Sequence, residues 1–377
     1  MSIAFVLSHI NQSTQWVWFS EELIRRKIPH VFIIINPVYP PLADELKALG
    51  ATVYYLPHRG FFQHIKNLFQ VISLLKKHRI SVVHSELPMG NLIGQFAARC
   101  CFIRARVVTC ENTTWAEDFN SSRQQLIDSF AYRSAKKVVA LTNEASAYLE
   151  KKFNVPAKKL MVIPHSLKQR EYEDIGTDRV AELRNSLSIS PDDFVIGMVA
   201  RFEYWKGHRY AVEALHQLSA EFPQVKLHII GGKGESFAEV MSLVEQYGLQ
   251  QKVYHHEYVA DNKALYHLFD VHLHVPINPL CETFGITIIE GMISARPQVL
   301  TLSGISVQTA DNEKNCLVVD YCSATAIYTA LKKIILDHEL GKRLGEQAKL
   351  DAIRMFNYKD KVEQHLDMYA DLLASSL

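Results

Sequence analysis

The chain has 377 residues, which is enough for two or three domains that each bury a core. Hydrophobic residues make up 48% and charged residues 21%, which excludes a disordered or collagen-like protein. The formal net charge of +1 conceals two halves of opposite sign. Residues 1–165 contain 20 Lys and Arg against 11 Asp and Glu, whereas the remainder contains 21 against 29. This asymmetry indicates that the two halves meet different partners.

The N-terminal sequence predicts a β-strand rather than a secretory signal. Its apolar stretch, residues 3–7, is shorter than the roughly 7–15 residues that such a signal needs. No apolar run approaches the roughly 20 residues that cross a bilayer. The six cysteines form no CxxC pair, so we expect reduced thiols. The sequence therefore predicts a cytoplasmic protein.

In the first half, short β-type runs alternate with amphipathic helical segments. Strands are predicted at residues 3–7, 31–35, 52–56, 81–84, 106–109, 137–141 and 160–164. Helices are predicted between them, at residues 16–27, 44–49, 65–78, 90–100 and 144–153. This alternation indicates parallel βαβ units and hence an α/β, doubly wound sheet.

The alternation fades at residues 165–191, a polar stretch whose start we interpret as a domain boundary, and it then resumes. Strands are predicted at residues 195–199, 227–231, 252–255, 271–275, 297–300 and 316–319, with helices such as 208–220 and 236–247. We predict a Rossmann-like domain at residues 1–168, a second at 190–354, and a terminal helix at about 355–377. Ligands of such sheets bind beyond the carboxyl ends of the strands, so we expect the active site in a cleft between the domains.

The first chemical motif follows the strand at 195–199. Arg201 and Lys206 stand five positions apart, and Lys206 is followed by Gly207 and a helix. A guanidinium and an ammonium at the end of a strand suit an oxyanion such as a diphosphate. The alternative is two solvated charges in a loop.

The second motif is a glycine-rich turn, Gly231-Gly232-Lys233-Gly234, between a strand and a helix. Glycines let the backbone approach a ligand, and a helix N-terminus favours anions. The turn matches neither the GxGxxG fingerprint nor a P-loop, which disfavours a nicotinamide dehydrogenase. An ordinary strand-to-helix turn would look similar.

The third motif places Glu282 and Glu290 around a helix start at Phe284-Gly285. Eight positions correspond to a little over two helical turns, so both carboxylates can address one ligand. The alternative is that Glu282 stabilises the helix dipole and that Glu290 lies on a polar face. Apolar neighbours such as Ile289 and Met292 argue against this for Glu290, because a carboxylate in an apolar helix requires a partner.

In order and spacing, these three motifs resemble retaining glycosyltransferase family 4, of GT-B fold. The resemblance implies that Arg201 and Lys206 bind the diphosphate of a nucleotide-sugar donor, and that Glu290 binds its ribose. It further implies that Glu282 addresses the donor sugar. The phosphates would be held by the turn at Gly232 and by the backbone of Phe284, Gly285 and Ile286. It also implies that the first domain, residues 1–168, binds the acceptor and that the second, residues 190–354, binds the nucleotide-sugar donor. The terminal helix would cross back to the first domain.

The first half departs from the family pattern. The family usually has a glycine pair after the first strand, where residues 9–14 read His-Ile-Asn-Gln-Ser-Thr. Glu111 stands where the family tends to place a histidine. A carboxylate there can contact a sugar or an acceptor hydroxyl, which makes Glu111 a candidate catalytic residue, or it can mark an altered or lost activity.

The expected function is transfer of a sugar, with retention of anomeric configuration, from a UDP- or GDP-linked donor to an acceptor hydroxyl. The acceptor is expected to be a glycan or lipid-linked saccharide of the cell envelope. Alternatives are a nucleotide-sugar epimerase of the same architecture and an inactive scaffold. We expect no metal and no bound cofactor. The chain lacks the Asp-x-Asp motif of GT-A transferases, and its 17 histidines, His272 and His274 included, form no zinc-type spacing.

A membrane is a further candidate partner, whereas nucleic acid is not expected. Residues 60–79 are apolar and basic, and the surrounding half of the chain is positively charged. The simpler interpretation is a core helix with a solvated basic end. The alternative is peripheral docking to anionic lipid, where a lipid-linked acceptor would lie.

Overall fold

The computed structural model describes residues 1–111, 122–173 and 175–375. The chain divides into two compact units, of which unit 1 comprises Met1–Ser166 with Tyr358–Leu377 and unit 2 comprises Leu167–Asn357. Residues 169–189, to which the sequence assigned no domain, thus belong to unit 2. No helix among the described residues is long and apolar enough to cross a membrane.

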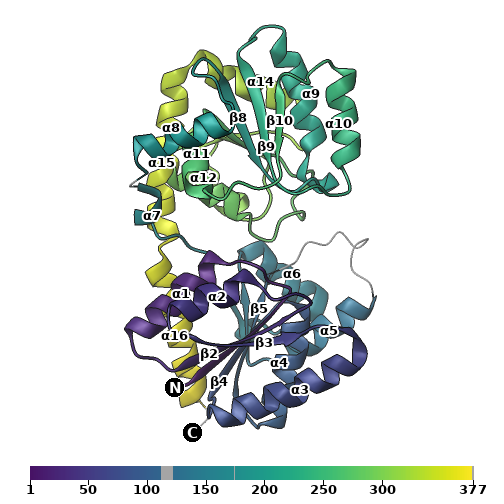
Figure 1. The fold of residues 1–377 in the computed structure, drawn as a ribbon, viewed down its shortest axis with the longest axis vertical. Helices are drawn as coiled ribbons and strands as arrows, with labels where there is room; N and C mark the ends of the chain where they lie inside the picture. The colour runs from purple at the N-terminus through teal and green to yellow at the C-terminus, as the bar shows by residue number, and fades with distance from the viewer. Residues whose placement is uncertain (112–121, 174, 376–377) are drawn as a thin grey trace. The chain divides into compact units, whose positions relative to one another are not determined.

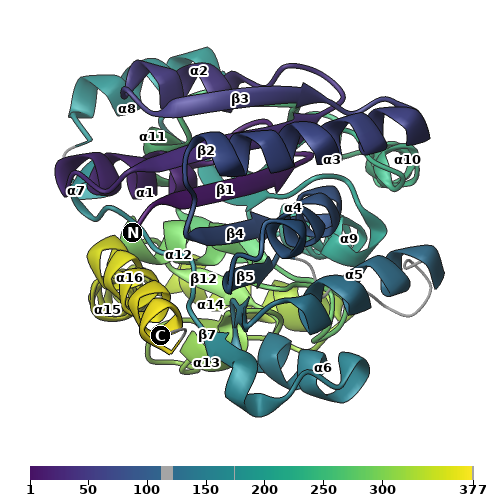
Figure 2. The ribbon, with the colours of Figure 1, turned by 90° about the horizontal axis from the view of Figure 1, so that it is seen from below.

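Within the described residues, unit 1 forms a seven-stranded parallel sheet in the order β3-β2-β1-β4-β5-β6-β7 (Figure 2). Its strands are β1 (Ile3–Ser8), β2 (His30–Asn36), β3 (Thr52–Pro57), β4 (Val82–Glu86), β5 (Ala105–Cys110), β6 (Lys137–Ala140) and β7 (Leu160–Val162). Its helices are α1 (Thr14–Arg25), α2 (Pro41–Ala48), α3 (Gly60–Lys77), α4 (Pro88–Cys100), α5 (Ser122–Ser134), α6 (Asn143–Phe153) and α16 (Tyr358–Ala374), with a 3-10 turn η1 (Ala157–Lys159). The strand order reverses between β1 and β4, which makes this pair the topological switch point of unit 1.

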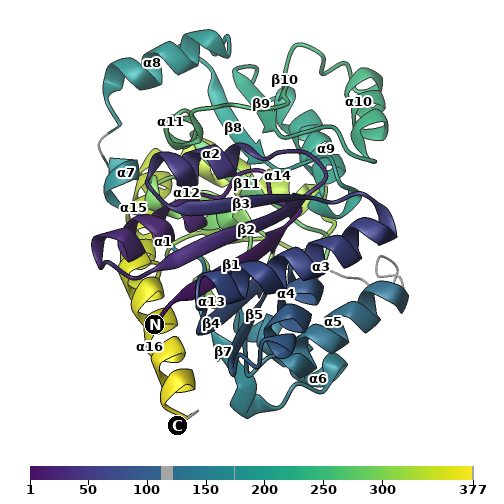
Figure 3. The ribbon, with the colours of Figure 1, turned by 60° about the horizontal axis from the view of Figure 1, so that its bottom comes forward.

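Helices cover both faces of the unit 1 sheet (Figure 3). Because successive strand residues point to opposite faces, Phe5 packs with α1, α2 and α16, whereas Val6 packs with α3 and α4. The terminal helix α16 contributes Val362 and Tyr369 to the first of these cores. It therefore packs on the sheet formed by the N-terminal part of the chain.

Within the described residues, unit 2 forms a six-stranded parallel sheet in the order β10-β9-β8-β11-β12-β13. Its strands are β8 (Phe194–Val199), β9 (Val225–Ile230), β10 (Val253–His256), β11 (Val271–His274), β12 (Gln298–Leu300) and β13 (Leu317–Val318). Its helices are α7 (Arg170–Glu173), α8 (Thr177–Ser186), α9 (His208–Ser219), α10 (Phe237–Gln246), α11 (Asn262–His267), α12 (Ile286–Ile293), α13 (Ser306–Thr309), α14 (Ala324–Leu336) and α15 (His338–Met355), with a 3-10 turn η2 (Tyr204–Lys206). The switch point lies between β8 and β11.

The faces of the second sheet are covered in the same manner (Figure 1). Ile196 on β8 packs with α9, α10 and α14, whereas its neighbour Val195 packs with α11. The expectation of two doubly wound α/β sheets is therefore confirmed.

The sequence prediction missed the helices α5, α7 and α8. Helix α5 was not predicted, and α7 and α8 lie in the stretch that appeared merely polar. Helix α8 has no buried residue, so its sequence lacks the apolar periodicity that marks a helix. The predicted terminal helix is also preceded by a break, because α15 ends at Met355 and α16 begins at Tyr358.

Candidate functional site

The switch point of unit 2 carries an ion pair between two residues predicted to bind one ligand. Lys206 ends the turn η2 that follows β8, and Glu282 lies in the loop between β11 and α12. The Lys206 ammonium donates a hydrogen bond to Oε1 of Glu282, and the His274 imidazole lies 3.5 Å from the same oxygen. Both partners are mostly buried, with 20% of the Lys206 and 10% of the Glu282 side chain exposed. The loops of the two switch-point strands are thus joined by a charge pair in the place where α/β sheets bind ligands.

Backbone contacts hold these loops in place. The N–H of Ile277, after β11, donates to the carbonyl of Trp205 in η2, and the N–H of Glu282 donates to the Ser303 hydroxyl. Gly207 follows Lys206 with φ of 79°, and a Cβ there would lie 2.0 Å from the carbonyl oxygen of Val275. Only glycine permits this close approach, so Gly207 fixes the position of Lys206.

Arg201 does not join this pair. Its side chain is 71% exposed and lies 3.3 Å from Glu203 within its own loop. Its role in diphosphate binding therefore stays a prediction.

The glycines of the turn after β9 differ in whether a Cβ atom would collide with the rest of the protein. A Cβ on Gly231 would lie 2.1 Å from the carbonyl oxygen of Ala200, and one on Gly234 would lie 2.4 Å from that of Phe202. These two glycines are required because the turn packs against the loop that carries Arg201. A Cβ on Gly232 would meet nothing within 4 Å, so no protein contact requires a glycine there.

We predict different outcomes for the two neighbouring glycines. Gly231→Ala should lower the free energy of unfolding by about 1–3 kcal/mol, because the loop after β8 must move. Gly232→Ala should stay within about 0.5 kcal/mol of wild type and should weaken nucleotide binding, since the added methyl occupies space that we assign to the donor. Denaturant unfolding and nucleotide titration of both variants check this. Unchanged nucleotide affinity of Gly232→Ala would remove Gly232 from the site.

The start of α12 has the geometry expected for an anion-binding helix N-terminus. Gly285, with φ of 81°, precedes the first helical residue, Ile286. The first N–H groups of a helix have no acceptor within the helix and carry a partial positive charge. Phe284 itself is buried, and its ring lies edge-on to that of Phe356 with centroids 6.1 Å apart. Only the backbone of Phe284 is therefore suited to ligand contact.

Glu290 lies in a separate polar cluster and not beside Lys206. The Tyr266 hydroxyl donates to its Oε2 at 2.8 Å, and the Tyr172 hydroxyl donates to its Oε1 at 3.1 Å. The amide of Asn262 lies 3.3 Å from the same Oε1. Burial raises the pKa of Glu290 to about 7, against the hydrogen bonds from Tyr266 and Tyr172, which lower it. The buried carboxylate thus has partners, but they come from α7 and α11.

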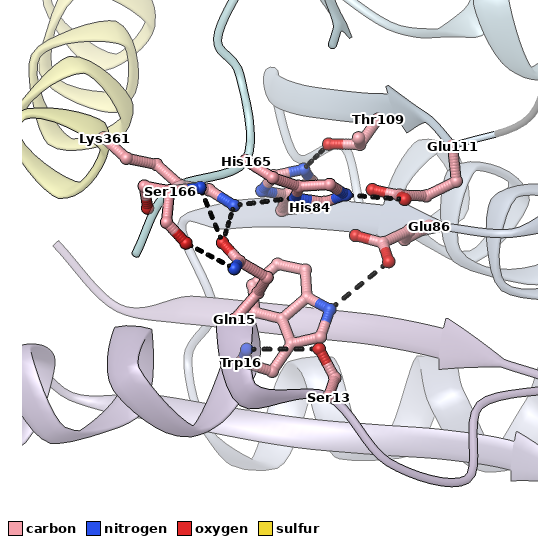
Figure 4. A network of polar contacts seen from close by, with 10 residues as sticks. All are labelled: Ser13, Gln15, Trp16, His84, Glu86, Thr109, Glu111, His165, Ser166 and Lys361. Atoms are coloured by element: carbon pink, nitrogen blue, oxygen red, sulfur yellow. Dashed lines mark hydrogen bonds and ion pairs between the residues drawn. The ribbon is translucent and has the colours of Figure 1, made fainter. Parts of the chain in front are cut away.

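The switch point of unit 1 carries a second cluster, which surrounds Glu111 (Figure 4). Glu111 directly follows β5, and its Oε2 lies 3.1 Å from Nε2 of His165. Nδ1 of His165 lies 3.2 Å from the ammonium of Lys361, which comes from α16. Glu86, the last residue of β4, is buried beside them and accepts a hydrogen bond from the Trp16 indole at 3.4 Å.

Sequence reasoning missed most partners in both clusters. Tyr172 lies in the stretch interpreted as a polar linker, and Lys361 lies in a helix recognised only by its apolar positions. Glu86 did carry a signal, because a charged residue directly follows a buried strand on the carboxyl edge of the sheet.

The strand histidines His272 and His274 make local contacts. Nδ1 of His272 lies 2.9 Å from the Gln298 amide, and Nδ1 of His274 lies 3.4 Å from the Thr287 hydroxyl. Burial lowers the pKa of each to about 3. Among the described residues, no group of three or more His, Cys, Asp or Glu side chains is placed to hold a metal ion.

Two family models match adjacent parts of the chain. Residues 13–167 match the model described as "Glycosyltransferase Family 4", and residues 180–351 match that described as "Glycosyl transferases group 1". The chain belongs to glycosyltransferase family 4. The resemblance inferred from the three motifs is thereby confirmed.

Curated relatives of this family 4 chain match over part of their length. O-antigen chain mannosyltransferase C of Escherichia coli is 29% identical over 58% of the chain and 56% of that protein. An uncharacterized glycosyltransferase of Methanocaldococcus jannaschii is 25% identical over 58% of the chain and 55% of that protein. The chain thus spans little more than half the length of these relatives.

Solved structures match over nearly the whole chain. HepE of Anabaena, in complex with UDP and glucose, has a TM-score of 0.85 at 18% identity, covering 98% of this chain and 99% of that one. WaaG, a glycosyltransferase involved in lipopolysaccharide biosynthesis, has a TM-score of 0.75 at 16% identity, covering 98% and 99%. The predicted GT-B fold is confirmed.

Proposed function

We propose that this family 4 protein transfers a sugar from a UDP- or GDP-linked donor to an acceptor hydroxyl, with retention of anomeric configuration. The observation that carries the proposal is the Lys206–Glu282 ion pair at the switch point of unit 2, beside the N-terminus of α12. The solved complex of HepE with UDP and glucose, a protein of the same fold, supports this choice of donor.

The chemical problem is departure of a diphosphate that gains negative charge. Lys206 supplies a positive charge held in place by Glu282, and the first N–H groups of α12 supply aligned donors. Charge stabilisation by such fixed groups is usually the largest single contribution to catalysis. Because these groups can neutralise the leaving diphosphate, the proposal includes no metal and no bound cofactor. Retention fits attack from the side of the leaving phosphate.

The same arrangement assigns Glu282 to the donor sugar and Glu290 to the nucleotide. Glu282 receives the donor sugar, and its charge is balanced by Lys206. Glu290 accepts the ribose hydroxyls, because its Oε2 has a single protein donor among the described residues and retains a free lone pair. Arg201, exposed at the rim, and the backbone around Gly232 complete the phosphate contacts.

The acceptor is proposed to be a glycan or lipid-linked saccharide of the cell envelope, and the protein is proposed to act in the cytoplasm. Two similar proteins support this choice, namely O-antigen chain mannosyltransferase C and WaaG, a glycosyltransferase involved in lipopolysaccharide biosynthesis. The transferred sugar is proposed to be a hexose.

Thermal stabilisation by a panel of UDP-, GDP- and ADP-sugars tests the donor assignment. One nucleotide class should raise Tm by several degrees, and the increase should disappear in Lys206→Met. Incubation with the bound donor then separates the alternatives, because an epimerase yields a new nucleotide sugar without releasing nucleoside diphosphate. Failure of every nucleotide sugar to raise Tm would contradict the proposal.

The exposed face of α3 supports the proposal of peripheral contact with anionic membrane. Phe62 and Phe69 are 86% and 66% exposed, and Ile65 lies between them on the same helical face. Exposed basic residues share this helix and its end, namely Lys66, Lys76, Lys77 and Arg79. Val71 and Leu75 bury the opposite face, so α3 is both a core helix and an amphipathic surface.

We expect binding to anionic vesicles at low salt. The double variant Phe62→Ser/Phe69→Ser should reduce the bound fraction at least about tenfold, because it removes the apolar side chains that enter the lipid. Leu350→Ser, which changes an exposed apolar residue of unit 2, serves as the matched control. Co-sedimentation measures the effect, and equal binding by all three proteins would exclude α3 as the contact.

A further inference from the structure

Helix α7 lies in the stretch interpreted as a polar linker, yet it contributes a buried side chain to the surroundings of Glu290. The helix begins at Arg170, shortly after the chain enters unit 2 at Leu167. Tyr172 on this helix is 2% exposed, and its hydroxyl donates to Oε1 of Glu290 at 3.1 Å. The carboxyl that we assign to the ribose is therefore held in part by the segment that follows the domain boundary.

Ion pairs anchor α7 on both sides of Tyr172. The Lys263 ammonium of α11 donates a hydrogen bond to Glu171, and the Lys349 ammonium of α15 lies 3.9 Å from Glu173. Glu171 and Glu173 flank Tyr172 in the sequence. Because the chain is held on each side of it, the Tyr172 hydroxyl is presented in a fixed direction.

The carboxyl group of Glu290 has one acceptor position left for a ligand. A carboxylate has about four lone pairs, two on each oxygen. The Tyr172 hydroxyl and the Asn262 amide occupy Oε1, at 3.1 and 3.3 Å, and the Tyr266 hydroxyl occupies one position on Oε2 at 2.8 Å. The remaining lone pair, on Oε2, is the one that a ribose hydroxyl can occupy without displacing a protein donor.

The Tyr172 hydroxyl is suited to keep its place when a nucleotide binds. Since the side chain is buried, moving away from Oε1 would leave the hydroxyl without an acceptor and unable to reach water. Its hydrogen bond also favours the ionised form of the carboxyl, which is the stronger acceptor for a further hydroxyl.

We propose that Tyr172 is a positioning residue of the donor site, which occupies Oε1 of Glu290 and thereby directs Oε2 toward a ribose hydroxyl of the nucleotide. This inference rests on the proposed function, in which Glu290 contacts the ribose. It gives the linker segment a role in nucleotide binding, separate from that of Lys206 at the diphosphate.

Ionisation of Glu290 gives this role a pH signature. Burial raises the pKa of Glu290 to about 7, whereas the hydrogen bonds from Tyr266 and Tyr172 and the charge of Lys263 lower it. Helix α15 also packs against α12, but its Lys349 pairs with a glutamate of α7. Nucleotide affinity should therefore rise as the pH increases through 7, and loss of the Tyr172 hydroxyl should move that rise to higher pH.

Calorimetric titration of the full chain between about pH 6 and pH 8.5 tests the proposal. The probe is whichever of UDP-glucose, GDP-mannose and ADP-glucose raises Tm most, because its diphosphate has no proton that titrates in this range. In wild type the Kd should fall about tenfold from pH 6 to pH 8, and in Glu290→Gln it should be weak and constant. Tyr172→Phe should raise the Kd at least about fivefold at pH 7, and the difference from wild type should narrow toward pH 8.5.

Two comparisons separate positioning from a structural effect. Tyr328→Phe also removes a hydroxyl that donates to a glutamate, but at an exposed position of unit 2, and should match wild type at every pH. The second comparison uses the nucleoside diphosphate of the same base and its 2′,3′-dideoxy analogue. Tyr172→Phe should bind the dideoxy compound as tightly as wild type does, since that compound has no ribose hydroxyl for Oε2 to accept.

Three outcomes overturn the proposal. They are an unchanged Kd in Tyr172→Phe, a Kd raised by the same factor at every pH, and an equal loss of affinity for the dideoxy compound. If wild type still shows the pH dependence that Glu290→Gln lacks, the ribose role of Glu290 stands and only the role of Tyr172 fails. If wild type binds none of the nucleotide sugars, the proposed function fails and this inference fails with it.

Discussion

Lys206→Met should lower kcat/KM for sugar transfer by about 10²–10³-fold while leaving the protein folded, which is the usual effect of removing one fixed group that stabilises developing charge. Lys206 is positioned by Glu282 and by Gly207, so its charge needs no reorganisation when the diphosphate departs. The fold should survive because methionine fills a similar volume. Steady-state release of nucleoside diphosphate measures the effect.

Lys233→Met is the matched control for this prediction. Lys233 lies in the glycine-rich turn after β9, is 56% exposed and pairs with Glu257 at 3.2 Å. Its loss should change kcat/KM only a few-fold. Equal losses in both variants would show that general positive charge, and not the Lys206–Glu282 geometry, drives turnover.

Glu290→Ala should lower the free energy of unfolding by about 2–4 kcal/mol, in addition to impairing donor binding. The substitution leaves the buried hydroxyls of Tyr172 and Tyr266 without their acceptor and opens a cavity between α7, α11 and α12. Glu290→Gln keeps the side-chain volume and one acceptor oxygen, so it should lower the free energy of unfolding by only about 1 kcal/mol. Denaturant unfolding of both variants separates the structural cost from the loss of ribose contact.

The same residue predicts a pH dependence of stability. The pKa of Glu290 is raised to about 7, so between its ordinary value of 4.5 and pH 7 the folded protein binds more protons than the unfolded chain. The stabilisation that proton binding by Glu290 gives to the folded protein is therefore fully present below pH 4.5 and is lost as the pH rises through 7. The resulting decrease in the free energy of unfolding is on the order of 3 kcal/mol. The difference in unfolding free energy between wild type and Glu290→Gln should fall over this range. A difference that is constant with pH would show that Glu290 is ionised throughout.

The strands were predictable because each buried strand consists of a short run of consecutive apolar residues. Residues 31–35, Val-Phe-Ile-Ile-Ile, are almost completely buried on β2 and can hardly form anything but an interior strand. Helix α5 was not predictable in this way, because its apolar residues are scattered among polar ones. Helix α8 lies on the surface and has no buried residue.

The site was predictable in its residues but not in its pairings. Motif spacing indicated that Lys206 and Glu282 serve one ligand, yet their mutual ion pair joins positions 76 apart and depends on the order of β8 and β11 in the sheet. Glu290 was expected to need a partner because its helix is apolar. Its partners could not be identified, since Tyr172 and Tyr266 approach it from helices that the sequence prediction did not name.

Glu111 illustrates a further limit of prediction from the sequence. Its departure from the family pattern was visible in the sequence, but its meaning was not, because Glu86, His165 and Lys361 reach it from distant parts of the chain. The order of β4, β5 and β7 in the sheet brings Glu86, Glu111 and His165 to one edge, and the packing of α16 on the sheet adds Lys361.

The most direct test of the central proposal, group transfer from a nucleotide sugar, is proton NMR of one reaction that contains the full chain, the stabilising donor, and octyl glucoside, galactoside and mannoside as acceptors. The account predicts that one nucleoside diphosphate appears for each sugar transferred, and that the new glycosidic bond has the anomeric configuration of the donor. Conversion of the donor to another nucleotide sugar without release of nucleoside diphosphate, or an unchanged donor with every acceptor, would contradict it.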